Sequence, residues 1–108
     1  MVLIVTNSLY PVTIAEEAGK KYIEIMKKYP IDKSIEKQIV PVAAKQTLEG
    51  IFVLSVTKVK QGKIKEAMDL ESKRMLEFGK IEGFKYSVEI MYDVVEAMGL
   101  LGMEAPVQ

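Results

Sequence analysis

The residue with the clearest chemical potential in this chain is Glu71. Residues 63–78 have the pattern of an amphipathic helix, and Glu71 falls within its apolar stripe, beside Met68, Met75 and Phe78. A carboxylate that is buried without a partner destabilises the fold, or its pKa rises until it is neutral. Such a group can act as a general base or hold a polar ligand. The alternative is structural: a small rotation of the stripe brings Glu71 to the rim, where it pairs with a lysine.

Two further acidic residues, Glu89 and Asp93, lie on one face of the predicted last strand. Four residues of strand separate them by about 13 Å, which is too far for an acid–base couple. One interpretation is that they line a polar cavity together with Ser55 and Thr57. The favoured alternative is that an edge strand shows its polar face to solvent or to the rim of a dimer.

Two tyrosines extend the set of candidate binding residues. Tyr22 and Tyr86 are predicted to meet in the core between the first helix and the sheet, with their hydroxyl groups at a pocket wall. Simple packing is the favoured alternative for both rings. The candidate ligand-binding residues are therefore Glu71, Tyr22, Ser55, Thr57 and Tyr86, and the candidate catalytic bases are Glu71 and Glu89.

The composition excludes many kinds of chemistry, because the chain has no cysteine, no histidine and no tryptophan. A disulfide framework, a thiol nucleophile, a Ser-His-Asp triad and the usual zinc or haem ligands are all excluded. Gly62 has the context of a turn, and no glycine-rich phosphate-binding motif occurs. We therefore expect neither a metal nor a cofactor. Fifteen basic and fifteen acidic residues cancel, so binding to nucleic acid or to an anionic membrane is not expected.

The length of 108 residues is typical of one domain, and we expect a single domain over residues 1–108 with a frayed end at 104–108. The chain opens with a strand-like segment and lacks the basic start of a signal peptide. No apolar run approaches the ~20 residues that a membrane-spanning helix needs. A cytoplasmic location is the resulting expectation.

Hydrophobic periodicity predicts the element order β-α-β-β-α-β. Thr13 and Glu16 have the spacing of a capping box, and Pro41 places the second strand at a sheet edge. Two split βαβ units then give a ferredoxin-like α+β sandwich. It has a four-stranded antiparallel sheet with central first and third strands, two helices on one face, and a short C-terminal helical appendage. The predicted strands are 1–6, 39–48, 51–59 and 84–94, the helices are 13–29 and 63–78, and the appendage is 95–103.

The third strand carries apolar residues on both of its faces. If Phe52, Leu54 and Val56 face the helices, the alternate residues face away from them, and three of these are large and apolar. A contiguous apolar patch of this kind must be covered, and a second copy of the chain is the simplest cover. The residues predicted to face away are Ile51, Val53, Ser55, Thr57 and Val59.

The element order, the chain length and the turn from Val59 to Lys63 (Val-Lys-Gln-Gly-Lys) resemble the dimeric α+β barrel superfamily. This group includes antibiotic-biosynthesis-monooxygenase-like, muconolactone-isomerase-like and stress-responsive proteins. The resemblance implies that ferredoxin-like protomers pair sheet to sheet, with a ligand pocket between sheet and helices or within the barrel. Monooxygenase-like members often use an asparagine, a threonine and a tryptophan; this chain has no tryptophan, so no catalytic set is transferred.

Two functional hypotheses follow, and a third remains open. The first is a small-molecule binding or regulatory homodimer, whose apolar pocket is gated by Glu71 and takes a small apolar or acidic organic ligand. The second is a cofactor-independent enzyme in which Glu71 or Glu89 removes a proton from an acidic C–H bond. The first is favoured, because histidine, the commonest base, is absent. The third is a purely structural role as an oligomer-forming protein.

Overall fold

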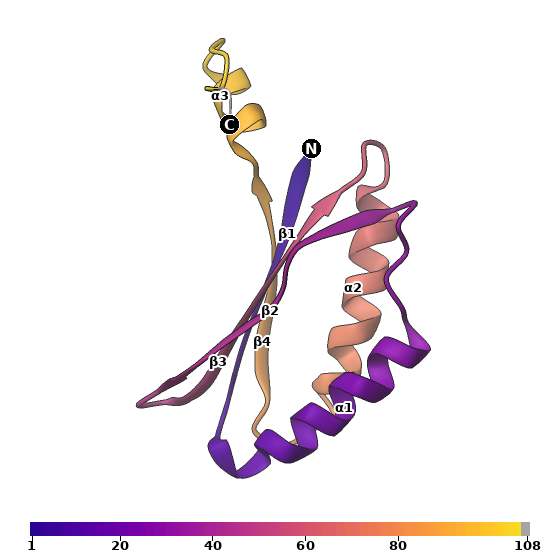
Figure 1. The fold of residues 1–108 in the computed structure, drawn as a ribbon, viewed down its shortest axis with the longest axis vertical. Coiled ribbons are helices and arrows are strands. Elements are labelled where there is room, and N and C mark those ends of the chain that lie inside the picture. Colours follow the sequence, from indigo (N-terminus) through magenta and orange to yellow (C-terminus); the bar gives the residue numbers. More distant parts are fainter. Residues whose placement is uncertain (107–108) are drawn as a thin grey trace.

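The computed structural model describes residues 1–106, which form an α+β fold with a four-stranded antiparallel sheet. Both long helices lie on one side of this sheet, and the C-terminal helix continues from β4 (Figure 1). The elements are β1 (Val2–Tyr10), the 3-10 turn η1 (Val12–Ile14), α1 (Ala15–Lys28), β2 (Glu36–Thr47), β3 (Gly50–Val59), α2 (Ile64–Phe78), β4 (Lys85–Tyr92) and α3 (Val94–Leu100).

The sheet order is β2-β3-β1-β4, so β1 and β3 are central and β2 and β4 lie at the edges. This arrangement is consistent with the predicted ferredoxin-like fold. Residues 101–106, which follow α3, have no helix or strand, and the last two residues of the predicted frayed end lie outside the described residues. No helix in the described part of the chain is long and apolar enough to cross a membrane.

The start of α1 differs from the predicted capping box. Ile14 occupies the N-cap position of α1, and no side chain there accepts a hydrogen bond from the first turn. The box is not formed because the chain leaves Pro11 in extended conformation and first makes the turn η1. The helix is stabilised instead by its buried stripe, which includes Ala18 and Ile25.

The first two strands are longer than their sequence patterns indicate. β1 continues to Tyr10, which pairs with Ile51 of β3. A central strand gains hydrogen bonds on both edges, and this pairing outweighs the turn preference of its polar residues. β2 contains register shifts on both sides of Val40, next to Pro41. Such irregularities accommodate a proline in an edge strand, as predicted.

The predicted orientation of the third strand is wrong. Register pairs Thr6 with Ser55 and Ser8 with Val53, and all four of these side chains line the space below the helices. Because neighbours along a strand point to opposite faces, Leu54 and its alternates lie on the uncovered face. Alternation in the sequence fixes which residues share a face, but it does not fix which face the helices cover.

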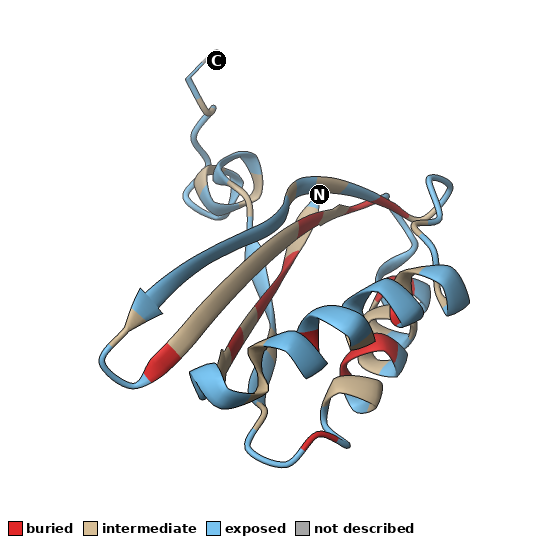
Figure 2. Ribbon diagram, turned by 60° about the horizontal axis from the view of Figure 1, so that its bottom comes forward, coloured by how far each residue is buried: buried red, intermediate tan, exposed pale blue. Residues whose placement is uncertain are grey.

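The buried core is small for a chain of this length. Ile4, Val59 and Ala67 form its centre, and Figure 2 shows buried residues along β1 and on the helix sides that face the sheet. The Cα radius of gyration is 15.3 Å, whereas a compact domain of this length has about 13 Å. The principal extents of 48 × 31 × 19 Å describe a thin, elongated protomer.

Candidate functional site

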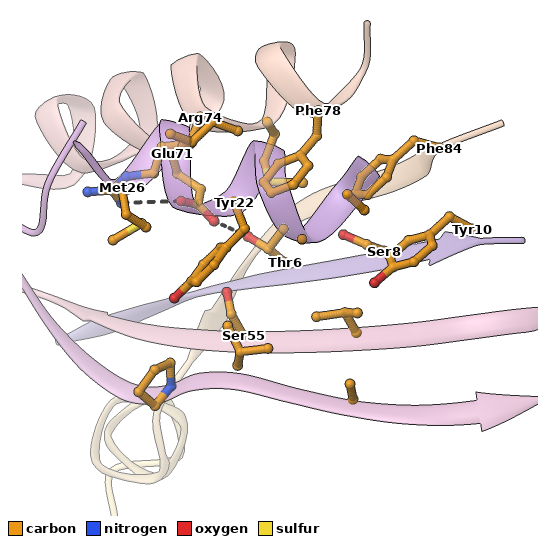
Figure 3. Close-up of a pocket in the computed structure, with 18 of the residues that line it drawn as sticks. Thr6, Ser8, Tyr10, Tyr22, Met26, Ser55, Glu71, Arg74, Phe78 and Phe84 are labelled. Atoms are coloured by element: carbon orange, nitrogen blue, oxygen red, sulfur yellow. Dashed lines mark hydrogen bonds and ion pairs between the residues drawn. The ribbon is translucent and has the colours of Figure 1, made fainter. Parts of the chain in front are cut away.

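A cavity of about 390 Å³ lies between the two long helices and the sheet. Its helix walls from α1 and α2 are largely apolar, and its sheet floor carries hydroxyl groups of β1 and β3 among apolar residues of β2 and β3. Figure 3 shows Tyr22, Thr6 and Ser55 near Glu71 at one end, and Phe78, Phe84 and Tyr10 at the other. The apolar lining includes Ala18, Ile25, Met26, Val53, Met75, Phe78 and Phe84, and the hydroxyl-bearing lining is Thr6, Ser8, Tyr10, Tyr22, Ser55 and Thr57.

A buried guanidinium, that of Arg74, closes the polar end of the cavity. Its Nε donates to the Tyr29 carbonyl oxygen at 3.0 Å, and its Nη2 donates to the Pro30 carbonyl oxygen at 3.0 Å. The two Nη atoms also bind both oxygens of Glu36, at 2.8 and 3.2 Å, and Nη1 donates to Glu71 Oε1 at 3.3 Å. Five acceptors thus match the five N–H donors that an arginine carries.

Local structure explains why these groups meet. Glu71 and Arg74 are three residues apart on α2, which places both on the same helix face. Tyr29 follows the last turn of α1, where carbonyl groups lack helical partners. The exposed fractions of the side chains are 6% for Arg74, 2% for Glu36 and 12% for Glu71.

The environment of Arg74 keeps its positive charge in place despite burial. Loss of hydration opposes the charged form, but hydrogen bonds and attraction from Glu36, followed by those from Glu71, outweigh it, and the pKa of Arg74 is raised. The ion pair with Glu36 is therefore a fixed part of the structure.

Glu71 is neither unpaired nor at the rim. Its Oε1 accepts from Arg74, and its Oε2 accepts from the hydroxyl group of Thr6 at 2.5 Å. This arrangement differs from both interpretations of the sequence, because the partners are an arginine and a threonine rather than a lysine. The carboxylate links α2 to β1 at the polar end of the cavity.

The structure brings most of the predicted binding residues together, but it separates two tyrosines that were predicted to meet. Tyr22, Ser55 and Thr57 line the same cavity as Glu71. Tyr86 does not line it: its side chain lies against Gly79, and its ring centroid is 6.5 Å from that of Phe84. The exposed fractions are 39% for Tyr22 and 38% for Tyr86, so neither ring is in the core.

Glu89 lies outside the cavity. It is exposed on the uncovered sheet face, where its Oε1 accepts from Asn7 at 3.3 Å and from Ser87 at 3.1 Å. It cannot line a cavity with Ser55, which faces the helices. Asp93 has a structural contact instead, because it caps α3 by accepting from the Glu96 backbone N–H at 2.8 Å.

Sequence reasoning missed Arg74, Glu36 and an aromatic stack at the far end of the cavity. Arg74 had a usable signal, because it is the chain's single arginine and lies on the same helix face as Glu71. Glu36 had none within its polar connecting segment. In the stack, Phe84 lies between Tyr10 and Phe78, with centroid separations of 5.1 and 4.9 Å. Burial raises the pKa of Tyr10, so its hydroxyl stays protonated at neutral pH.

A glycine in the body of α1 also lines the cavity. A Cβ atom at Gly19 would meet no atom within 4 Å. Glycine in a helix interior costs about 0.5–1 kcal/mol relative to alanine. Gly19 therefore leaves space at the cavity wall at the expense of helix stability.

Comparisons with known proteins support the fold alone. The chain is similar to a solved structure described as "De novo designed protein Foldit4", with a TM-score of 0.53 and 12% sequence identity, over 85% of this chain and 96% of that chain. Neither the models of protein families nor the sequences of curated proteins match this chain. The structural likeness supports a small α+β fold with a four-stranded antiparallel sheet and carries no activity with it.

Proposed function

We propose that this protein binds a small organic molecule in the cavity between its helices and its sheet, as a ligand-binding or regulatory homodimer. The observation that carries the proposal is the cavity of about 390 Å³ itself. Sites for small ligands have volumes of roughly 300–1,000 Å³, apolar walls and a few convergent polar groups. The apolar walls and the hydroxyl-bearing floor have this composition.

The polar groups of the floor have capacity for a ligand. Among the described residues, the hydroxyl groups of Ser8, Ser55 and Tyr22 have no hydrogen-bond partner, although all three line the cavity. A hydroxyl group can donate one hydrogen bond and accept others. Each oxygen of Glu71 accepts one hydrogen bond, which holds the carboxylate in place and supports a binding role over proton abstraction by this group.

Occlusion of the cavity tests the proposal with a matched control. Gly19→Leu adds a side chain at the cavity wall, whereas Gly99→Leu adds the same side chain to α3, where a Cβ also meets nothing within 4 Å. The neutral indole tryptophol is a suitable probe, because the chain has no tryptophan and indole fluorescence reports the ligand alone. We expect Gly19→Leu to weaken binding by about tenfold, which corresponds to about 1.4 kcal/mol. Equal binding by both variants would contradict the proposed site.

The uncovered sheet face supports the homodimer. Val5, Leu9, Phe52, Leu54 and Val56 share this face by register, and α1 and α2 both lie on the other side (Figure 1). Val5 is buried by its neighbours in the sheet and the other four are half-buried, so the face offers a contiguous, partly accessible apolar surface that a partner can cover. The elongated protomer agrees with a fold completed by a second copy, whose sheet packs face to face in the manner of the dimeric α+β barrels.

Light scattering tests the dimer directly. Wild-type protein at micromolar concentration should have twice the mass of one chain, and Leu54→Lys should have the mass of one. The control is Leu76→Lys, since Leu76 lies on α2 and is 62% exposed, away from the open sheet face. A monomeric wild type would overturn the dimer without affecting the cavity.

A further inference from the structure

The ion-pair cluster at the polar end of the cavity carries an unbalanced charge. Two carboxylates, of Glu36 and Glu71, surround the single guanidinium of Arg74, so the formal charges sum to one negative charge. Glu71 and Arg74 are the only charged residues in the cavity lining that the structure describes. Glu36 is not part of that lining, so Glu71 is the carboxylate of the cluster that borders the cavity, and Arg74 is shared between the two carboxylates.

Arg74 is not available to an anionic ligand. Its donors are matched by two backbone carbonyl oxygens, both oxygens of Glu36 and one oxygen of Glu71. A ligand carboxylate would have to displace one of these partners, and it would also approach Glu71. Burial of a further negative charge beside a carboxylate is unfavourable.

From this charge arrangement we infer that the ligand is an organic cation, an amine carried on an aromatic or other apolar body. The inference rests on the proposed binding function and replaces the acidic ligand class that the sequence left open. Glu71 uses one acceptor position on each oxygen, whereas a carboxylate offers about four in total. An ammonium group can therefore bind Glu71 without displacing Thr6 or Arg74.

The aromatic residues place the rest of the ligand. Phe78 lies seven residues beyond Glu71 on α2, which is about 10 Å along the helix. Its ring and those of Phe84 and Tyr10 form the apolar end of the cavity, and Tyr22 lies beside Glu71 (Figure 3). An aromatic face near an ammonium group adds a favourable cation–π contact. The cavity thus selects positive charge at one end and an apolar ring at the other.

Three indoles that differ only in the end of a short side chain test the charge preference. Tryptamine is a cation, tryptophol is neutral and indoleacetate is an anion; the anisotropy of indole fluorescence measures each Kd in this tryptophan-free protein. We expect tryptamine to bind about tenfold or more tighter than tryptophol, because hydrogen bonds to charged groups exceed neutral ones. Indoleacetate should bind more weakly than tryptophol.

Two variants assign the preference to the cavity. Glu71→Gln removes the charge with little change of shape and should equalise tryptamine and tryptophol. Glu89→Gln makes the same change on the open face and should leave the preference intact. Should Glu71→Gln fail to fold, the order of the three probes on wild type still decides the inference.

The outcomes separate the two proposals. Tighter binding of indoleacetate or tryptophol than of tryptamine would overturn the cation inference and retain the binding function. A tryptamine preference that Glu71→Gln retains and Glu89→Gln abolishes would also overturn the inference. The absence of binding by all three probes would overturn the binding function and the inference together.

Discussion

The two faces of the central strands have opposite compositions. On β1 and β3, the face beneath the helices carries Thr6, Ser8, Ser55 and Thr57, whereas the uncovered face carries Val5, Leu9, Phe52, Leu54 and Val56. A sheet covered on one side normally shows apolar residues to the helices and polar residues to solvent. In this molecule the middle of the covered face is polar, whereas Ile4 and Val59 on the same face are apolar and form the buried core.

The difference between the two faces supports both proposals, a ligand on the helix side of the sheet and a second copy of the chain on the other side. Hydroxyl groups beneath helices are stable where they line a polar or occupied cavity. The hydrogen-bonded network of Arg74, Glu36 and Glu71 lies at one end of this cavity. Apolar residues on the outer face are stable where a partner covers them. The ligand site and the association surface that we propose would therefore lie on opposite sides of one sheet.

On the covered face, Arg74→Met should cause the largest loss of stability. This substitution leaves Glu36, which is 2% exposed, buried without its partner. Loss of one member of a buried ion pair destabilises a protein by about 3–5 kcal/mol. Urea unfolding should show this decrease, whereas Lys28→Met, which removes the exposed pair with Glu77, should leave the midpoint nearly unchanged. Similar midpoints for the two variants would contradict the structural role of the network.

A smaller effect is expected when one polar position on the covered face is made apolar. Ser55→Val replaces a cavity hydroxyl group by a methyl group and adds a second methyl group at the same Cβ. Because the added methyl groups are half-buried and the hydroxyl group forms no hydrogen bond within the described protein, we expect the ligand-free protein to become more stable by about 1 kcal/mol. Calorimetry measures the change, and Ser87→Val on the exposed face serves as the control. A clear loss of stability would mean that Ser55 has a partner in solution.

Gly19→Ala tests whether the glycine at the cavity wall lowers the stability of α1. Alanine should stabilise α1 by about 0.5–1 kcal/mol, since no atom opposes the added Cβ. Gly62→Ala is the contrasting control: the φ angle of Gly62 is 77°, a left-handed conformation that destabilises alanine by about 1–2 kcal/mol. Thermal unfolding distinguishes the two. A destabilised Gly19→Ala protein would contradict the space assigned to this position.

The smallest expected effect concerns the pH dependence of Asp93, whose carboxylate caps α3 outside the cavity. The Glu96 backbone N–H, followed by the N-terminal ammonium group, lowers the pKa of Asp93 below its ordinary value. Its contribution to α3 is therefore complete above the ordinary pKa and is lost as the pH falls through the lowered one. NMR signals of α3 should shift in that acidic range in wild type and not in Asp93→Asn. Unchanged wild-type signals would exclude the cap.

The sequence named Glu71, Tyr22, Ser55 and Thr57 as candidate binding residues, but it placed Ser55 and Thr57 on the sheet face away from the helices. It predicted the element order, the edge position of β2 and the place of Glu71 in the stripe of α2. These depend on periodicity, on the chemistry of Pro41 and on helix spacing, all of which are local. The pairing of Glu36 with Arg74 was not predictable in the same way, because it joins groups 38 residues apart across a tertiary contact. The choice of covered face also failed, because the middle of that face is polar in this sheet, against the general rule that apolar residues point inward.

The most direct test of the account uses the methionine methyl groups as reporters on both faces. Met26 and Met75 line the cavity, and Met91 is 50% exposed on the uncovered face, opposite Leu3. The protein labelled at its methionine methyl groups is titrated with tryptamine and, at higher concentration, with tryptophol, and the NMR signals are followed. We predict that Met26 and Met75 shift with saturation while Met91 stays in place. Shifts at Met91, with none at Met26 and Met75, would contradict a ligand site between the helices and the sheet.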